Sequence, residues 1–222
     1  MEIKNKNGEV LFSLASNSLK GVDLSSLDLR GANLTDADLR LAKLNGANLG
    51  GANLSGADLE RASFTRVNLC RVNLTGAILH CADLSDANLT WATLKSANLR
   101  NADVRSANLP WVNLEGADLR GANLHGADLT DVDLESTDIS NADLRNAKLA
   151  NNVLRFEGMP WEVMIVGKYL RMGRQYHTID AWDAFSNEEI DNMGKDVLVF
   201  WKAKKDMLLG IARLIGSPEM PC

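Results

Sequence analysis

The sequence lacks several features that would place it in common classes of protein. None of the apolar runs in its 222 residues reaches the length of about 20 that a membrane-spanning helix needs. Residues 1–12 contain no apolar segment typical of a secretory signal peptide. Three cysteines, an odd number, argue against a disulfide scaffold and suit a reducing compartment. We therefore expect a cytoplasmic protein that does not insert into a membrane.

Motifs for catalysis and for cofactor binding are also missing. The sequence contains no P-loop, no G-x-G-x-x-G after a strand, no G-x-S-x-G, no H-E-x-x-H and no pair of C-x-x-C motifs. Its three histidines lie far apart, and the net charge of −5 does not suit a protein that binds nucleic acid through a basic surface. We expect no catalytic residues, no metal, no cofactor and no direct contact with nucleic acid.

What the sequence does contain is a repeat of five residues. Stepping by five from Leu14 to Leu154 gives 29 consecutive apolar positions, all leucine except Phe64, Val104 and Ile139. A second column lies two residues earlier, from Val22 to Ala147, and 19 of its 26 residues are alanine. Between the two columns the residue is Asp or Asn in 21 of 26 cases. A pattern this long indicates a repeat architecture.

A period of five is neither the 3.6 of a helix nor the 2.0 of a strand. Within each repeat, however, the two apolar positions are two apart, so both side chains point to the same side of a short extended segment. The other residues must turn the chain, and Asn and Asp suit corners because their side chains bond to nearby backbone. Glycine recurs two places after the leucine, where a turn can need a positive φ: Gly31, Gly46, Gly51, Gly56, Gly76, Gly116, Gly121 and Gly126.

The repeats resemble a known family. Gly-Ala-Asn-Leu occurs at 31–34, 51–54 and 121–124, and Gly-Ala-Asp-Leu at 56–59, 116–119 and 126–129. These units resemble the pentapeptide-repeat family, whose pattern is A(D/N)LXX. The resemblance implies an all-β fold, a right-handed quadrilateral β-helix with four pentapeptides per coil. Residues 20–155 would make about seven coils.

Three segments follow from the pattern. Residues 1–19, with Asn-Gly at a turn, are expected to form a hairpin that caps the β-helix. Residues 156–222 lack the repeat and are expected to form a small α/β domain, with a hairpin about 167–168, short helices after Thr178 and Ser186, and a helix from Asp196 to Ile215. The apolar stripe of that helix is a candidate cap or homodimer interface: Val197, Phe200, Trp201, Leu208, Ile211 and Ile215.

One outward column of the β-helix is unusual. Residues twenty apart should stack on neighbouring coils, which aligns Arg71, Trp91, Trp111 and Asp131. Two outward tryptophans are unfavourable on a soluble surface, and the arginine could lie over the first ring as a cation–π pair. We interpret the column as a candidate partner-binding surface. The alternatives are a patch covered by the C-terminal domain and a surface for self-association.

Charge is also uneven along the repeat. Between Gly121 and Leu144 there is no Lys or Arg, and six acids occur: Asp128, Asp131, Asp133, Glu135, Asp138 and Asp143. The resemblance implies that such an acidic face could mimic DNA and act on DNA gyrase or topoisomerase IV. The alternative is a solvated surface that keeps the protein soluble.

The sequence therefore predicts a non-enzymatic protein that binds a protein partner of unknown identity. A DNA mimic directed at DNA gyrase is the second hypothesis. A small-ligand or catalytic role of the C-terminal domain, around Tyr176, His177 and Trp182, is the third.

Overall fold

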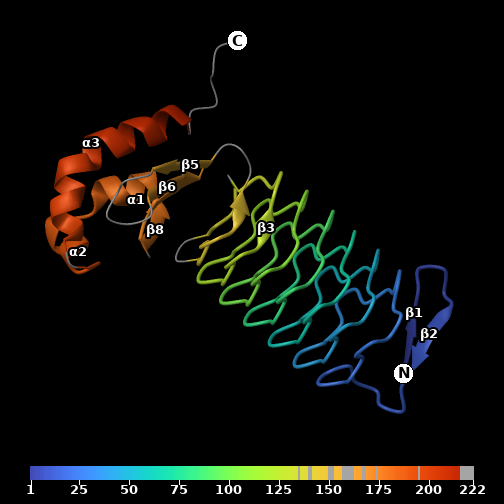
Figure 1. Cartoon of the computed structure of the whole chain (residues 1–222). Helices are drawn as coiled ribbons and strands as arrows, with labels where there is room; N and C mark the ends of the chain where they lie inside the picture. The colour runs from blue at the N-terminus through green and yellow to red at the C-terminus, as the bar shows by residue number, and fades with distance from the viewer. Residues whose placement is uncertain are drawn as a thin grey trace, which may run out of the picture. The chain divides into compact units, whose positions relative to one another are not determined.

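The computed structural model of the chain describes residues 1–134, 136–139, 142–149, 153–156, 163–166, 169–173, 175–194 and 196–215 (Figure 1). Among these, the side chains of 153–156, 207 and 210–215 are not described. The chain divides into two compact units, Met1–Ala150 and Asn151–Cys222, which we call the solenoid unit and the C-terminal unit. The expected boundary at 155/156 therefore lies five residues too late.

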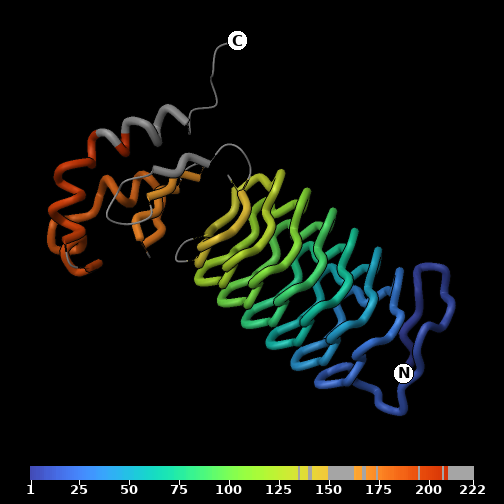
Figure 2. The backbone as a smooth tube through the Cα atoms, in the orientation of Figure 1, coloured from blue at the N-terminus to red at the C-terminus, as the bar shows by residue number. Residues whose placement is uncertain are grey.

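The solenoid unit is a stack of coils joined by parallel backbone hydrogen bonds. The N–H of Leu24 donates to the carbonyl of Lys43 (2.7 Å), and the N–H of Lys43 donates to the carbonyl of Val22 (2.8 Å). Parallel bridges with the same spacing of twenty recur from Asp23–Lys43 onward, and near the end β3 (Asp128–Leu129) pairs in parallel with β4 (Lys148–Leu149). The backbone trace in Figure 2 follows these successive turns. Twenty residues, or four pentapeptides, therefore make one coil.

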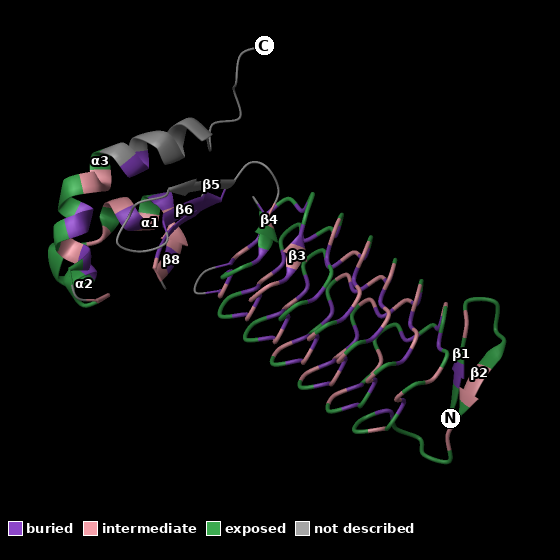
Figure 3. Ribbon diagram, viewed as in Figure 1, coloured by how far each residue is buried: buried purple, intermediate pink, exposed green. Residues whose placement is uncertain are grey.

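The two apolar columns form the core of this unit. Every fifth residue from Leu19 to Leu144 is buried, including Phe64, and alanines two residues earlier lie beside them (Figure 3). Leu14 lies outside the core because it belongs to the segment before the first coil. One large and one small inward side chain therefore alternate along the coil, and the second column is alanine except where a somewhat larger residue, such as Val67 or Val72, is buried in its place.

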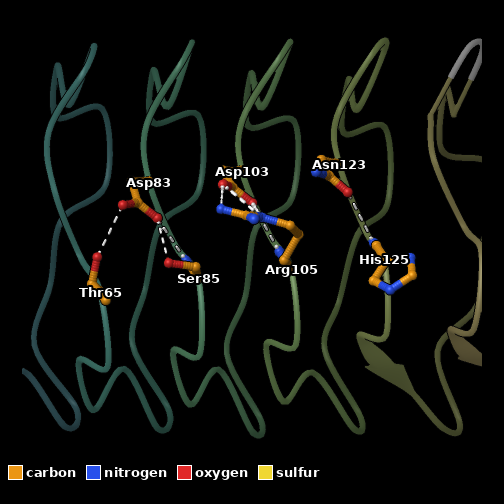
Figure 4. Close-up of polar contacts among 7 residues, drawn as sticks. All are labelled: Thr65, Asp83, Ser85, Asp103, Arg105, Asn123 and His125. Carbon is orange, nitrogen blue, oxygen red and sulfur yellow. Dashed lines mark hydrogen bonds and ion pairs between the residues drawn. The ribbon is translucent and has the colours of Figure 1, made fainter.

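The corners are held by the Asp and Asn residues, as the sequence predicts. At three successive coils a side-chain Oδ1 accepts the backbone N–H two residues later: Asp83 from Ser85 (3.0 Å), Asp103 from Arg105 (3.2 Å) and Asn123 from His125 (3.2 Å) (Figure 4). This side-chain bond satisfies a backbone donor at the point where the chain turns.

The N-terminal segment is a hairpin of β1 (Glu2–Lys4) and β2 (Val10–Ser13), paired antiparallel. The hairpin also bonds to the first coil, because the N–H of Asn33 donates to the carbonyl of Lys4 (2.8 Å). Ile3 is buried at this contact. The hairpin thus covers part of the open edge that a solenoid would otherwise expose.

In its described residues, the C-terminal unit consists of an antiparallel sheet and three helices. Its strands run in the order β5 (Val153–Phe156), β6 (Val163–Val166), β7 (Tyr169–Met172) and β8 (Gln175–Thr178), followed by α1 (Ile179–Ala184), α2 (Asn187–Asp191) and α3 (Val197–Ile215). The sequence predicts only the central hairpin, and it extends the repeat to Leu154. In the structure Leu154 pairs antiparallel with Ile165, so it belongs to the sheet and not to a coil.

Helices α1 and α2 begin at the predicted caps, and the helices pack around an aromatic core. Thr178 accepts the N–H of Ala181, and Ser186 forms a reciprocal capping box with Glu189, as the sequence predicts. The indole of Trp182, fully buried, donates to the carbonyl of Leu170 at 2.5 Å. No helix in the described part of the chain has the length and apolarity to cross a membrane.

Candidate partner-binding surface

The corner positions of the solenoid have an unusual backbone conformation. Each corner is a turn in which an N–H donates to the carbonyl three residues earlier, such as Ala92 to Leu89 (2.8 Å). The third residue of the turn has a left-handed φ, as in a type II turn. The eight glycines predicted there have φ between 64° and 69°. Many coils, however, place another residue in this conformation, at roughly 1–2 kcal/mol relative to glycine.

Trp91 and Trp111 occupy two of these left-handed positions, with φ of 60° and 56°. Their rings stack with centroids 4.9 Å apart and an interplanar angle of 15°. The pair remains exposed to solvent, at 54% for Trp91 and 47% for Trp111. Neither the backbone strain nor the exposure of two indoles helps the solenoid to fold. Selection for folding alone therefore does not account for this pair.

Arg71 and Asp131 flank the pair at the same corner, and both are exposed and left-handed, with φ of 58° and 56°. Within the described residues neither side chain forms an ion pair. Arg71 and Trp91, which are both described, also do not form the expected cation–π contact. Most other arginines of the solenoid lie against a carboxylate two residues away, such as Arg105 against Asp103. The column is therefore two stacked indoles between two charges, neither of which forms an ion pair with any residue that the structure describes.

A cavity of about 490 Å³ opens beside the second tryptophan. It is lined by Trp111, Val112, Asn113, Leu114, Glu115, Asp131, Asp133 and Ser136. On either side of this cavity the coils are joined by the regular parallel bridges Asn108–Asp128 and Asp118–Asp138. Between these two bridges, side chains link the two coils. The hydroxyl of Thr137 donates to the carbonyl of Leu114 (3.0 Å), and the N–H of Gly116 donates to the Ser136 hydroxyl (3.3 Å).

Sequence reasoning missed this cavity, because an unbroken period of five predicts a surface without a cleft. One signal was present: Thr137 is the only polar residue of the second inward column. Its hydroxyl must find an acceptor when buried, and the acceptor it takes is a carbonyl of the neighbouring coil. A polar residue in an alanine column therefore predicts a local change in how two coils are joined.

The acids between 121 and 144 do not form one face. Turns separate Asp128, Asp133, Asp138 and Asp143, so these four residues lie on four successive sides of the coil. Cations lie against several of them: Lys148 on Asp128 (3.2 Å), Arg120 on Asp138 (3.5 Å) and Arg145 on Asp143 (2.6 Å). A hydrogen bond from the Thr130 hydroxyl lowers the pKa of Asp128, and Lys148 lowers it further. Glu135 lies outside the described residues. Among the described residues, Asp128, Asp133, Asp138 and Asp143 do not share a single acidic face.

The candidate interface of the C-terminal helix is used inside its own unit. Val197, Phe200, Trp201 and Leu208 are buried in one cluster with Trp182 and residues of β6 and β7. The side chains of Ile211 and Ile215 lie outside the described part. The four described residues therefore have a folding role that leaves them inaccessible to a second copy.

Of the three residues of the predicted ligand site, His177 and Trp182 are in contact, but Tyr176 lies on the opposite face of its strand. Neighbours on a strand point to opposite faces, and His177 contacts Trp182 and Phe185 edge-on (5.5 and 4.9 Å), whereas Tyr176 stacks on Tyr169. Burial lowers the pKa of His177 and raises that of Tyr176 well above its ordinary value. In the described part of the chain no group of three His, Cys, Asp or Glu side chains could hold a metal ion.

Comparison with known proteins identifies the repeat. The family description "Pentapeptide repeats" matches residues 18–56, 52–90, 82–121 and 113–151, more than half of the chain. The chain belongs to the pentapeptide-repeat family. Members of this family form right-handed β-helices, which agrees with the four-sided coils of this pentapeptide-repeat protein.

Several solved structures are similar to this pentapeptide-repeat protein. A trypsin-treated form of QnrB1, described as a plasmid-mediated fluoroquinolone resistance protein, is 20% identical over 54% of this chain and 70% of its own, with a TM-score of 0.37. Rfr23 from the cyanobacterium Cyanothece 51142 is 28% identical over 58% of this chain and 88% of its own, with a TM-score of 0.34. HetL from Nostoc sp. strain PCC 7120 is 27% identical over 61% and 92%, with a TM-score of 0.17. No curated protein sequence matches the chain significantly. The family assignment rests on the repeat match.

Proposed function

We propose that this pentapeptide-repeat protein is a non-enzymatic interaction protein that binds a protein partner through the corner bearing Arg71, Trp91, Trp111 and Asp131. The observation that carries the proposal is the exposed Trp91–Trp111 stack at left-handed positions. Tryptophan and arginine are the residues that most often dominate binding energy at protein interfaces. Glycine or asparagine would fit these two positions with less backbone strain and no exposed apolar area.

DNA mimicry is less well supported by the same structure. A mimic needs carboxylates spaced along one face, whereas four of the acids lie on four sides and cations neutralise three of them. A ligand site in the C-terminal unit is also less well supported, because Tyr176 and Trp182 are core residues.

Photocrosslinking of the full chain tests the proposal. A photoreactive residue replaces Pro110, which precedes Trp111 in the turn, and a control reporter replaces Arg100, which occupies the same turn position two corners earlier. In extracts of the source cells we expect a protein adduct from position 110 and none from position 100. The mass of the adduct distinguishes a second copy of the 24.2 kDa chain from another protein.

Matched substitutions decide whether the tryptophans are responsible. Trp91→Asn with Trp111→Asn should abolish the adduct while circular dichroism and thermal stability remain within about 1 kcal/mol of wild type, because relief of backbone strain offsets the lost stacking. The control is Leu41→Asn, since Leu41 is an exposed apolar residue with φ of 59° at another corner. An adduct that survives the double substitution would contradict the proposal.

A further inference from the structure

The side of the solenoid that carries the tryptophans is complementary to itself. Along the corner the order is Arg71, Trp91, Trp111, Asp131, one residue per coil, with opposite charges at equal distances from the centre of the indole stack. Neighbouring coils are about 4.8 Å apart, so the column spans roughly 14 Å. A two-fold axis across the solenoid between the tryptophans would place each arginine against an aspartate and each indole against an indole.

The next two columns of the same side have the same property. The first of these outward columns consists of Asn73, Thr93, Asn113 and Asp133. The two-fold axis pairs Asn73 with Asp133 and Thr93 with Asn113. The second of these columns contains Lys95 and Glu115, which form an ion pair within one chain at 2.9 Å. The two-fold axis would place Lys95 of each copy against Glu115 of the other. All three columns therefore match in the antiparallel orientation. In the parallel orientation Arg71 would face Arg71 and Asp131 would face Asp131.

The cavity beside Trp111 has a counterpart under this symmetry. It lies between the coils of Trp111 and Asp131, so the axis sets it opposite the coils of Arg71 and Trp91 in the second copy. The cavity offers a guanidinium the face or edge of an indole and the carboxylates of Asp131 and Asp133. Arginine binds well in such surroundings, through cation–π contact and paired hydrogen bonds to carboxylate.

We infer that the occupant of this surface is a second copy of the chain, docked antiparallel, with Arg71 of each copy entering the cavity beside Trp111 of the other. This inference rests on the proposed function, because it names the partner of the same surface. One side of four coils is narrow, so the contact belongs to the small interfaces below about 1,200 Å² and the dissociation constant should be micromolar or weaker.

Analytical ultracentrifugation of the full chain from about 1 µM to 1 mM tests the inference. Wild type should pass from monomer to dimer in this range. Arg71→Asp and Asp131→Arg should each weaken dimerisation by about tenfold or more, because each places like charges together. The double variant R71D/D131R should regain the dimer, and an equal mixture of the two single variants should form a heterodimer.

Charge reversals at another corner provide matched controls. Arg66→Asp and Asp86→Arg change the same charges at left-handed positions (φ 59° and 56°) that belong to a different column, and both should leave dimerisation unchanged. A wild-type chain that is monomeric at 1 mM would overturn the inference. A dimer insensitive to both Arg71 and Asp131 would overturn it equally.

The crosslinking result separates failure of this inference from failure of the proposed function. An adduct from position 110 with a different protein, together with a monomeric wild type, would overturn the second copy as occupant and retain the proposed function. Absence of any adduct together with a monomeric wild type would overturn both.

Discussion

The two units of the chain reach stability in different ways. The solenoid unit repeats one contact many times, a leucine on a leucine and an alanine beside them, from Leu19 to Leu144. The C-terminal unit has a single core of unlike side chains, in which Trp182 contacts Trp201, Phe185 and His177 at 5.0, 5.7 and 5.5 Å. In the first unit each coil depends mainly on its two neighbours, whereas in the second one residue contacts much of the core.

This difference separates folding from function in the solenoid. Because the inward columns alone specify the coil, the corner residues are free to vary within what a left-handed φ permits. Side chains as different as Arg71, Trp91 and Asp131 occupy the same position in successive coils. The side chains of the outward columns can therefore form a binding surface without any change of the fold.

The largest effect should come from removing a core residue in each unit. Trp182→Ala should cost about 3–5 kcal/mol, and Leu89→Ala about 2–5 kcal/mol. The loss expected for Trp182→Ala is comparable with the whole free energy of unfolding of a unit of this size. Protection from hydrogen exchange should therefore fall throughout the C-terminal unit. Leu89→Ala should reduce protection only in the coils beside it, which exchange measured by mass spectrometry on the full chain would show.

Val199→Ala is the control for Trp182→Ala, since Val199 lies on α3 of the same unit but is 71% exposed. It should change protection in neither unit. If Leu89→Ala lowered protection uniformly from residue 1 to residue 149, the solenoid would be one cooperative body and the comparison would fail.

A smaller effect should come from the corner conformation itself. Gly51 has φ of 66°, and a side chain there would meet nothing within 4 Å. Gly51→Val should therefore destabilise the solenoid by roughly 1–2 kcal/mol through backbone strain alone. Gly51→Asn should cost only a few tenths, because asparagine tolerates this conformation. Urea denaturation of the two variants measures the difference, and equal midpoints would show that the corner does not select residues by φ.

The sequence predicted the solenoid well because its signal is summed over many equal repeats. The inward columns, the Asx corners and the glycine positions all follow from side-chain direction and turn chemistry, and the structure agrees at Asp83, Asp103 and Gly31. The helix caps at Thr178 and Ser186 were equally local and equally predictable.

What the sequence could not supply depends on contacts between distant segments. Leu154 continues the period of five, yet it pairs with Ile165 because a longer antiparallel strand is available there. The acids Asp128, Asp133, Asp138 and Asp143 belong to successive repeats and for that reason lie on different sides of a coil that turns every five residues. The cavity beside Trp111 depends on how one hydroxyl, that of Thr137, is satisfied by the neighbouring coil.

The smallest effect we expect is a loss of stability at low pH that is confined to the solenoid unit. The guanidinium of Arg40 bonds both carboxylate oxygens of Asp38 (2.8 and 2.7 Å) and lowers the pKa of that carboxyl to about 2. Because the folded-state pKa lies below the unfolded value near 4, the stabilisation is present above about pH 4 and disappears as the pH falls toward 2. The same arrangement recurs at four more corners: Asp28–Arg30, Asp103–Arg105, Asp118–Arg120 and Asp143–Arg145.

These pairs are exposed, so each contribution should be small and should weaken as salt is added. Arg40→Gln should shift the urea midpoint of the solenoid at pH 5 and not at pH 2, whereas Arg66→Gln, which removes an arginine without an ion pair in the described residues, should shift it at neither. The C-terminal unit, followed by the fluorescence of its three tryptophans (Trp161, Trp182 and Trp201) in a chain whose solenoid tryptophans are replaced by asparagine, should show no such dependence on Arg40. A response of both units to that one substitution would show that the corners of the solenoid contribute to the stability of the second core, and that the two units do not reach stability separately.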